Sequence, residues 1–314
     1  MQETWLNMKD IVDYLGVTAE TVRSWINNKG FPAIKVGGRW KFRLSEVDAW
    51  LKQSESPLKN HHNKYMSCKF QPTLIHDDCL HALKSLDDSS VDLVLTDPPY
   101  NLGLFMKNRD AGIARMRDNY FGAAGWDNLE YSQWAKCMDS MFEEAARLLK
   151  AGGAMIVFMA VIKVETIVEL AQKHGFYYKT TGTWHKLNPM PRNMNLHFIN
   201  STESWIYFIY GGKTGTFNNN GKALHDFIET SITSKNERSW GKHPTQKPVA
   251  LMEYFVKTLS NSGGVVLDPF MGSGSTGVAS MNLNRRFIGI EVDDTYYEIA
   301  CNRMEDCSEK AAGN

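Results

Sequence analysis

From residue 70 onward, short apolar segments alternate with longer segments that repeat apolar residues at helical spacing. The short segments predict strands and the longer ones predict amphipathic helices. Strands are predicted at 72–76, 91–96, 154–159, 177–184, 204–210, 265–267 and 287–290, and helices at 79–86, 132–149, 162–174, 248–259 and 276–281. This alternation is typical of a mostly parallel sheet with helices on both faces. We therefore predict an α/β fold, a doubly wound Rossmann-like sheet, over residues 70–314.

Residues 1–52 show a different pattern and predict a separate module. Two helices are predicted at 8–15 and 18–26, then a hairpin around Gly37-Gly38 and a further helix at 45–51. This order resembles the winged helix-turn-helix modules of excisionases and of regulators related to the mercury-resistance regulator. The resemblance implies DNA contacts by Thr21, Arg23, Asn27, Lys35, Arg39, Lys41 and Arg43. A module for protein contacts is the alternative. The polar, aperiodic stretch 53–69 predicts a linker.

Composition narrows the classes of protein that remain. The 35 Lys and Arg balance the 35 Asp and Glu, so any DNA binding must rely on local basic stripes. Five cysteines without a C-x-x-C pair predict reduced thiols and neither a disulfide framework nor a metal site. The N-terminus does not read as a signal peptide, and no apolar run reaches the roughly 18–20 residues of a membrane span. We expect a soluble, cytoplasmic protein without a metal.

A glycine turn is predicted directly after the strand at 265–267. Residues 272–277 read G-x-G-x-x-G, and Glu291 ends the next strand, so a nicotinamide or flavin dinucleotide site is one interpretation. A P-loop is excluded because no Lys follows the last Gly. Asp268 decides between the remaining ligands, since a carboxylate at the turn repels a pyrophosphate. The same carboxylate attracts the ammonium and sulfonium of S-adenosylmethionine, which we therefore expect as cofactor.

A second motif, Asp97-Pro98-Pro99-Tyr100, follows the strand at 91–96. Ligands of open α/β sheets bind beyond the carboxyl ends of the strands. The two prolines remove backbone donors, which leaves a carboxylate, carbonyl oxygens and an aromatic face. This set suits an amino group on a flat ring, and a base in duplex DNA must be flipped out to reach it.

The two motifs in this order resemble the DNA amino-methyltransferases in their beta arrangement, over residues 70–305. The resemblance implies an S-adenosylmethionine-dependent methyltransferase fold, found in bacteria or their phages. It also implies direct methyl transfer to the N6 amine of adenine in double-stranded DNA, with Asp97, Pro98, Pro99 and Tyr100 as catalytic residues. N4-cytosine chemistry is the alternative, although Asp97 favours adenine. A non-enzymatic DNA-binding regulator is a third possibility, and a homodimer is possible.

Further segments that match this family imply the remaining site residues. Those expected at the cofactor are Asp78, Cys79, Asp97, Thr245, Gln246, Lys247, Asp268, Pro269, Phe270, Gly272, Ser273, Gly274, Ser275, Thr276 and Glu291. Sequence reading is expected at about 190–240, and the long loop 101–128 is expected to contact phosphates and bases. DNA contacts in and beside these regions are expected from Lys107, Arg109, Arg115, Arg117, Lys186, Asn188, Arg192, Asn193 and Asn195.

Overall fold

The structure, a computed structural model, describes residues 5–15, 17, 19–28, 30–53, 70–102, 129–190 and 198–312. The chain divides into two compact units, residues 1–64 and 65–314, and the division falls within the stretch that the sequence predicts as a linker. Each unit has its own core of buried apolar side chains.

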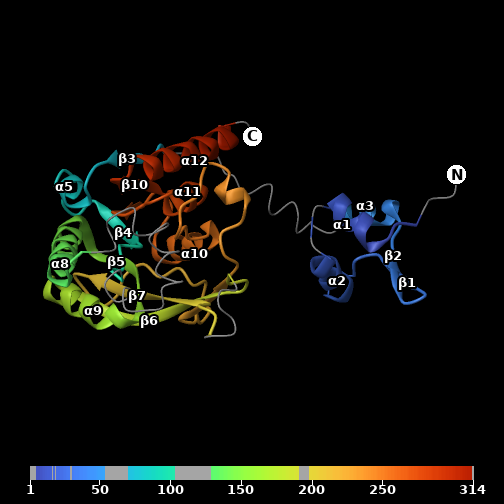
Figure 1. Cartoon of the computed structure of the whole chain (residues 1–314), viewed down its shortest axis with the longest axis horizontal. Helices are drawn as coiled ribbons and strands as arrows, with labels where there is room; N and C mark the ends of the chain where they lie inside the picture. The colour runs from blue at the N-terminus through green and yellow to red at the C-terminus, as the bar shows by residue number, and fades with distance from the viewer. Residues whose placement is uncertain are drawn as a thin grey trace, which may run out of the picture. The chain divides into compact units, whose positions relative to one another are not determined.

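The smaller unit has the order helix, helix, hairpin, helix that the sequence predicts. It contains α1 (Met8–Leu15), α2 (Ala19–Asn28), β1 (Ile34–Val36), β2 (Arg39–Lys41) and α3 (Leu44–Gln53) (Figure 1). Gly37 and Gly38 form the turn of the hairpin with φ of 56° and 79°, a conformation that suits glycine. The core consists of Ile11, Val22, Trp25, Phe31, Phe42 and Val47.

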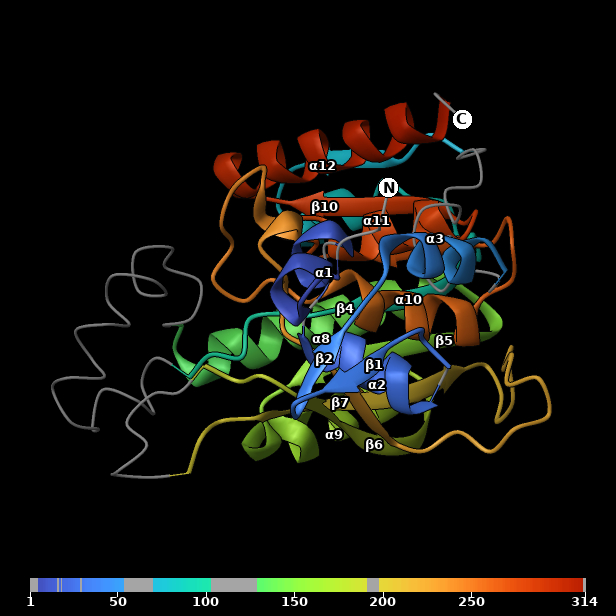
Figure 2. The ribbon, with the colours of Figure 1, turned by 90° about the vertical axis from the view of Figure 1, so that its right-hand side faces the viewer.

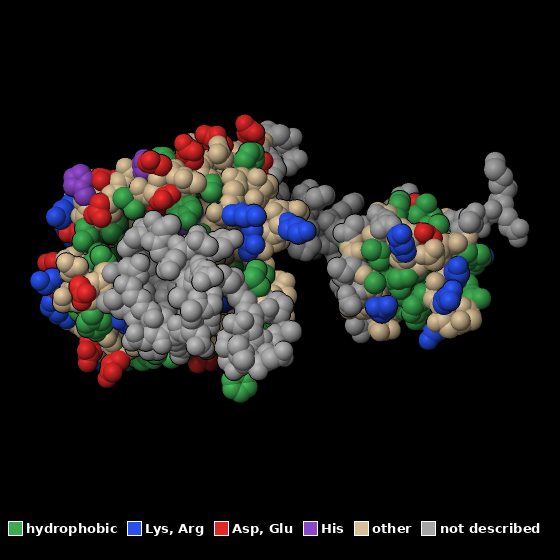
Figure 3. Space-filling view, in the orientation of Figure 1, with side chains coloured by type: hydrophobic (Ala, Val, Ile, Leu, Met, Phe, Trp, Pro, Cys, Tyr) green, Lys and Arg blue, Asp and Glu red, His purple; other side chains and the backbone are tan. Residues whose placement is uncertain are grey.

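Basic side chains of the smaller unit lie on its surface. Arg23, Lys35, Arg39 and Arg43 are exposed, and Lys41 is half-buried. Two other predicted DNA contacts follow the same pattern: Asn27 is exposed and Thr21 is half-buried. Figure 3 shows more Lys and Arg than Asp and Glu on the face of this unit that is turned to the viewer.

The larger unit is built on an eight-stranded sheet in the order β3-β10-β9-β4-β5-β7-β6-β8. Its strands are β3 (Thr73–His76), β4 (Val91–Thr96), β5 (Leu149–Met159), β6 (Phe176–Lys186), β7 (Thr202–Tyr210), β8 (Phe227–Thr230), β9 (Val265–Asp268) and β10 (Arg286–Glu291). Neighbouring strands are parallel except at β7, which is antiparallel to both β5 and β6. The predicted mostly parallel, doubly wound sheet is confirmed.

Helices cover both faces of this sheet (Figures 1 and 2). One face carries α5 (Cys79–Leu83), α8 (Tyr131–Leu148) and α9 (Val164–Lys173), and the other carries α10 (Val249–Leu259), α11 (Ser275–Asn282) and α12 (Asp294–Ala312). Single 3₁₀ turns occur at Val161–Lys163 and Asn236–Arg238. In the central strand β5, side chains alternate between the two cores, as the twofold period of a strand requires. None of the described helices is long and apolar enough to cross a membrane.

Two elements are absent from the sequence-based prediction. Strand β8 has only four residues and an exposed Phe227, so it gives little pattern. Helix α12 is mostly polar and buries few apolar side chains, among them Ile299, Ala300 and Met304. This last helix nevertheless packs on the first strand of the unit: the ring of Tyr297 stacks on His76 at 4.6 Å, and its hydroxyl donates to the Leu74 carbonyl at 3.4 Å.

Candidate functional site

The two corners that the sequence singles out lie side by side. Strands β4 and β9 pair in parallel, with Leu93 opposite Val266 and Val94 opposite Leu267. The carboxyl ends of both strands therefore meet, and the Thr96 hydroxyl donates to Asp268 Oδ1 at 2.9 Å. The Asp97 turn and the glycine turn therefore face each other across neighbouring strand ends.

Asp268 is a buried carboxylate that fixes the start of the glycine turn, with only 4% of the residue exposed. Besides Thr96, it accepts hydrogen bonds from the Thr276 hydroxyl at 2.7 Å and from the Phe270 amide at 3.2 Å. Burial raises the pKa of Asp268 to about 7, although these three donors act against the increase. The carboxylate thus stands in a dry environment that favours a nearby positive charge.

The turn after β9 is shaped by glycines with positive φ. Gly272 has φ of 50°, and a Cβ there would lie 3.0 Å from the His243 ring. Gly274, with φ of 77°, is the N-cap of α11, and its αL conformation favours glycine. The Gly272 amide donates to Glu291 Oε2 at 2.9 Å, so the acid at the end of β10 lies at this turn. The result is a buried stretch of backbone with two glycines, placed between two carboxylates.

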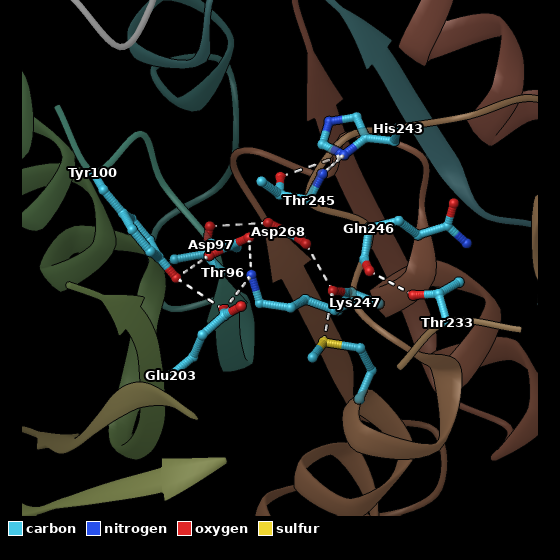
Figure 4. A network of polar contacts seen from close by, with 12 residues as sticks. Thr96, Asp97, Tyr100, Glu203, Thr233, His243, Thr245, Gln246, Lys247 and Asp268 are labelled. Atoms are coloured by element: carbon cyan, nitrogen blue, oxygen red, sulfur yellow. Dashed lines mark hydrogen bonds and ion pairs between the residues drawn. The ribbon is translucent and has the colours of Figure 1, made fainter. Parts of the chain in front are cut away.

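Four charged side chains and one phenol converge at the Asp97 corner, and Figure 4 shows Asp97, Glu203, Lys247 and the phenol of Tyr100. The Tyr100 hydroxyl donates to Asp97 Oδ1 at 2.8 Å, and the Lys247 ammonium contacts Asp97 Oδ2. Lys247 also lies 3.1 Å from Glu203 Oε2, and Lys186 lies 2.7 Å from Glu203 Oε1. Lys247 itself is 6% exposed. An ammonium this far from water requires such carboxylate partners.

Burial and the nearest opposite charge shift the pKa of each of these groups in opposite directions. Burial raises the pKa of Asp97 above its ordinary value, Lys247 acts against this and Glu203 adds to it. Burial lowers the pKa of Lys247, but Asp97 and Glu203 outweigh that effect, so its pKa is raised. Burial raises the pKa of Glu203, but Lys247 and Lys186 outweigh it, so its pKa is lowered. Lys247 and Glu203 therefore form a charged pair beside Asp97.

Helix α8 contacts the turn that follows Asp97. The indole of Trp134, which is 1% exposed in α8, donates to the Pro99 carbonyl at 2.8 Å. Asn101 follows Tyr100 with φ of 50° and is buried. The Pro98-Pro99 backbone is thus clamped between the end of β4 and α8.

The other residues predicted at the cofactor lie after β3, in the segment before α10, or in the glycine turn. Asp78 follows β3 and caps α5, accepting from the amides of Leu80 and His81, and Cys79 is buried behind it. The Gln246 side chain donates to the Glu237 carbonyl at 2.9 Å, and the Thr245 amide donates to His243 Nδ1 at 3.3 Å. Within the glycine turn, Pro269, Ser273, Ser275 and Thr276 are buried and Phe270 is partly buried.

In the larger unit, two residues predicted at DNA make polar contacts within the chain. Lys186 pairs with Glu203, and the Asn188 side-chain oxygen accepts from the Ile232 amide at 2.8 Å. Seven further predicted contacts lie outside the described residues, namely Lys107, Arg109, Arg115, Arg117, Arg192, Asn193 and Asn195.

Sequence reasoning did not single out Glu203, Trp134, His243 or Arg303. Arg303 donates from α12 to Ser273 and Ser275, and burial lowers the pKa of His243 to about 4, so its ring is neutral. The sequence signal for His243 is its position in the segment that also contains Thr245, Gln246 and Lys247. In the described part of the chain, no three His, Cys, Asp or Glu side chains are grouped to hold a metal ion.

Comparison with known proteins agrees with this arrangement. A family model described as DNA methylase matches residues 91–302, and a helix-turn-helix domain model matches residues 5–55. The Type II methyltransferase M2.DpnII of Streptococcus pneumoniae is 31% identical over 244 residues, which cover 74% of this chain and 89% of that protein.

Solved structures show the same fold. The M1.HpyAVI–SAM complex is 30% identical with a TM-score of 0.57, covering 74% of this chain and 99% of that one. The cytosine-N4-specific PvuII DNA methyltransferase shares the fold at a TM-score of 0.58 and 16% identity, over 78% of this chain and 96% of that one. Because the family model spans both the Asp97 corner and the Asp268 corner, the chain belongs to the DNA methylase family.

Proposed function

We propose that the chain transfers a methyl group from S-adenosylmethionine to the N6 amine of adenine in double-stranded DNA. The observation that carries this proposal is the pairing of β4 with β9, which brings Asp97 and the glycine turn to one edge of the sheet. A base bound at the first corner and a cofactor at the second would then be neighbours.

The glycine turn suits this cofactor. Positive φ at Gly272 and Gly274 leaves backbone without side chains, and Asp268 and Glu291 supply negative charge beside it. We assign the cofactor to this turn, to Asp78 and to the segment with Thr245, Gln246 and Lys247. When bound, the cofactor supplies an electrophilic methyl group on a sulfonium. The protein needs only to hold that methyl in line with the amine, because positioning provides much of the rate.

Asp97 and the Pro98 carbonyl would accept hydrogen bonds from the two N–H groups of the amine and draw the nitrogen toward a tetrahedral shape. The methylated amine would then lose one hydrogen as a proton, which Asp97 would take up. Tyr100, whose hydroxyl is held by Asp97 at 2.8 Å, would stack on the flipped base. Trp134 fixes the neighbouring Pro99 carbonyl, so the turn is rigid before the base arrives. No covalent intermediate is required.

DNA recognition is assigned to two parts of the chain. The helix-turn-helix unit offers exposed Arg23, Lys35 and Arg39 to the duplex. Residues 190–240 would read sequence near the flipped base. A homodimer and a cytoplasmic location remain predictions of the sequence.

The test is methylation of a random duplex library by Asp97→Ala. We expect calorimetric binding of S-adenosylhomocysteine near the normal value, while the single-turnover rate falls by about a hundredfold or more. Asp87→Ala, which removes an exposed carboxylate, is the matched control. Retained transfer by Asp97→Ala would count against the assignment.

The same library identifies the base. Digestion of the product and mass spectrometry should find N6-methyladenine. N4-methylcytosine would replace the adenine proposal by the cytosine alternative, whose relative PvuII methyltransferase shares the fold.

A further inference from the structure

We infer that Glu203 is a positioning residue, which shares the Lys247 ammonium with Asp97 so that Asp97 can release Lys247 and receive the amine of the target base. This inference rests on the proposed function. It adds a role for an acid on β7, a strand that supplies none of the motif residues.

The geometry places Glu203 at the centre of a chain of alternating charges. Its Oε2 lies 3.1 Å from the Lys247 ammonium and 3.5 Å from the Tyr100 hydroxyl, and its Oε1 lies 2.7 Å from Lys186. The Glu203 side chain is 22% exposed and that of Lys186 is 15% exposed. Both oxygens of Glu203 are therefore engaged at the Asp97 corner.

The four charges come from four different segments. Asp97 follows β4, Glu203 lies near the start of β7, Lys186 ends β6, and Lys247 precedes α10. The negative charges of the two carboxylates equal in number the positive charges of the two ammonium groups, so the cluster is neutral as a whole. The aromatic faces of Phe158 and Tyr100 lie 5.1 and 5.8 Å from the Lys247 nitrogen and add weak attraction for the cation.

Lys247 occupies an oxygen of Asp97 that the proposed reaction needs. A buried ammonium does not leave a carboxylate without another anion to receive it. Glu203 is that anion, and Lys247 already touches it, so a small shift of the ammonium from Asp97 to Glu203 exposes the acceptor. Without the charge of Glu203, Lys247 would remain on Asp97 and compete with the amine.

The charged and titratable groups facing Asp97 are Lys247, Glu203, Tyr100 and, across the β4–β9 pair, Asp268. The carboxylate of Glu203 raises the pKa of Asp97. Glu203→Gln should therefore lower the pKa of Asp97 and move the acidic limb of the rate profile to lower pH. Loss of packing would lower this pKa as well, because burial is the main cause that raises it, so thermal unfolding is measured alongside to detect a loosened fold.

The experiment compares Glu203→Gln with the double variant Glu203→Gln/Lys186→Met, in which the charges of the cluster balance again. Single-turnover methyl transfer at saturating DNA and cofactor is measured against pH, with S-adenosylhomocysteine affinity and thermal unfolding alongside. Glu144→Gln is the matched control, because Glu144 pairs with Arg147 at 2.7 Å within α8 and its side chain is 18% exposed, similar to that of Glu203.

We expect Glu203→Gln to lower the plateau rate by about tenfold and shift the acidic limb downward, with cofactor affinity kept within about twofold. The double variant should regain thermal stability and remain slow. A wild-type rate in Glu203→Gln, a slow rate without a shift of the limb, or a double variant that regains the rate would each overturn the inference. Failure of the proposed function itself would appear separately, as full activity in Asp97→Ala.

Discussion

The buried carboxylate of Asp268 should make the stability of the larger unit fall as pH rises, and Asp268→Asn should remove that dependence. The pKa of Asp268 is about 7 in the folded protein, whereas an unfolded Asp has a pKa of about 3.9. Between these values the folded state binds more protons than the unfolded state. Stability from the protonated group is fully present below pH 4 and is lost as pH rises through 7.

The magnitude follows from the two pKa values. Relative to the fully protonated group, ionisation costs about 1.5 kcal/mol at pH 5 and about 4 kcal/mol at pH 8. The free energy of unfolding of Asp268→Asn minus that of the wild type should therefore increase by about 2.5 kcal/mol between these pH values. Asparagine keeps the size of the side chain, and its loss of acceptor capacity toward Thr96 and Thr276 is the same at both pH values.

The assay is urea unfolding of both proteins at several pH values from 5 to 8, without cofactor, followed by far-ultraviolet circular dichroism. Taking a difference cancels the titration of all other groups. Asp87→Asn, an exposed site, should show a constant difference from the wild type. A constant difference for Asp268→Asn as well would refute the reasoning, since Asp268 would then titrate equally in both states.

Three further perturbations test other parts of the structure. Trp134→Phe removes the hydrogen-bond donor to the Pro99 carbonyl and should lower the single-turnover rate about tenfold at unchanged cofactor affinity. Trp205→Phe, in the core on the other face of the sheet, is the control and should leave this rate unchanged. Equal effects of the two variants on the rate would contradict the role of Trp134. Gly277→Ala places a Cβ 2.2 Å from Met304 and should destabilise the unit by about 1–3 kcal/mol in urea unfolding. Removing residues 1–55 should weaken DNA binding and flatten its salt dependence in filter-binding assays, while turnover at saturating DNA persists.

The fold could be predicted from the sequence because short apolar strands alternate with helices that repeat apolar residues at helical spacing. The site could be predicted only where a motif ends a strand, as at Asp97 and Asp268. Glu203 carries no local signal: it reaches Asp97 because β7 pairs with β5 in one particular register, and register is a property of the assembled sheet. Lys247 is expected at the cofactor, and its contact with Asp97 depends on packing between residues that lie 150 positions apart in the sequence.

The packing of Tyr297 on His76 and Leu74 has a consequence for how enzymes of this kind can be rearranged. Helix α12, the last described element of the larger unit, thus contacts β3, the first described strand of that unit. A circular permutation that joins α12 to β3 and opens the chain between β4 and β9 would reverse the order of the two motifs while leaving both at the same sheet edge. The proposed chemistry thus depends on where the two motifs lie in the folded sheet, and it does not depend on their order along the chain.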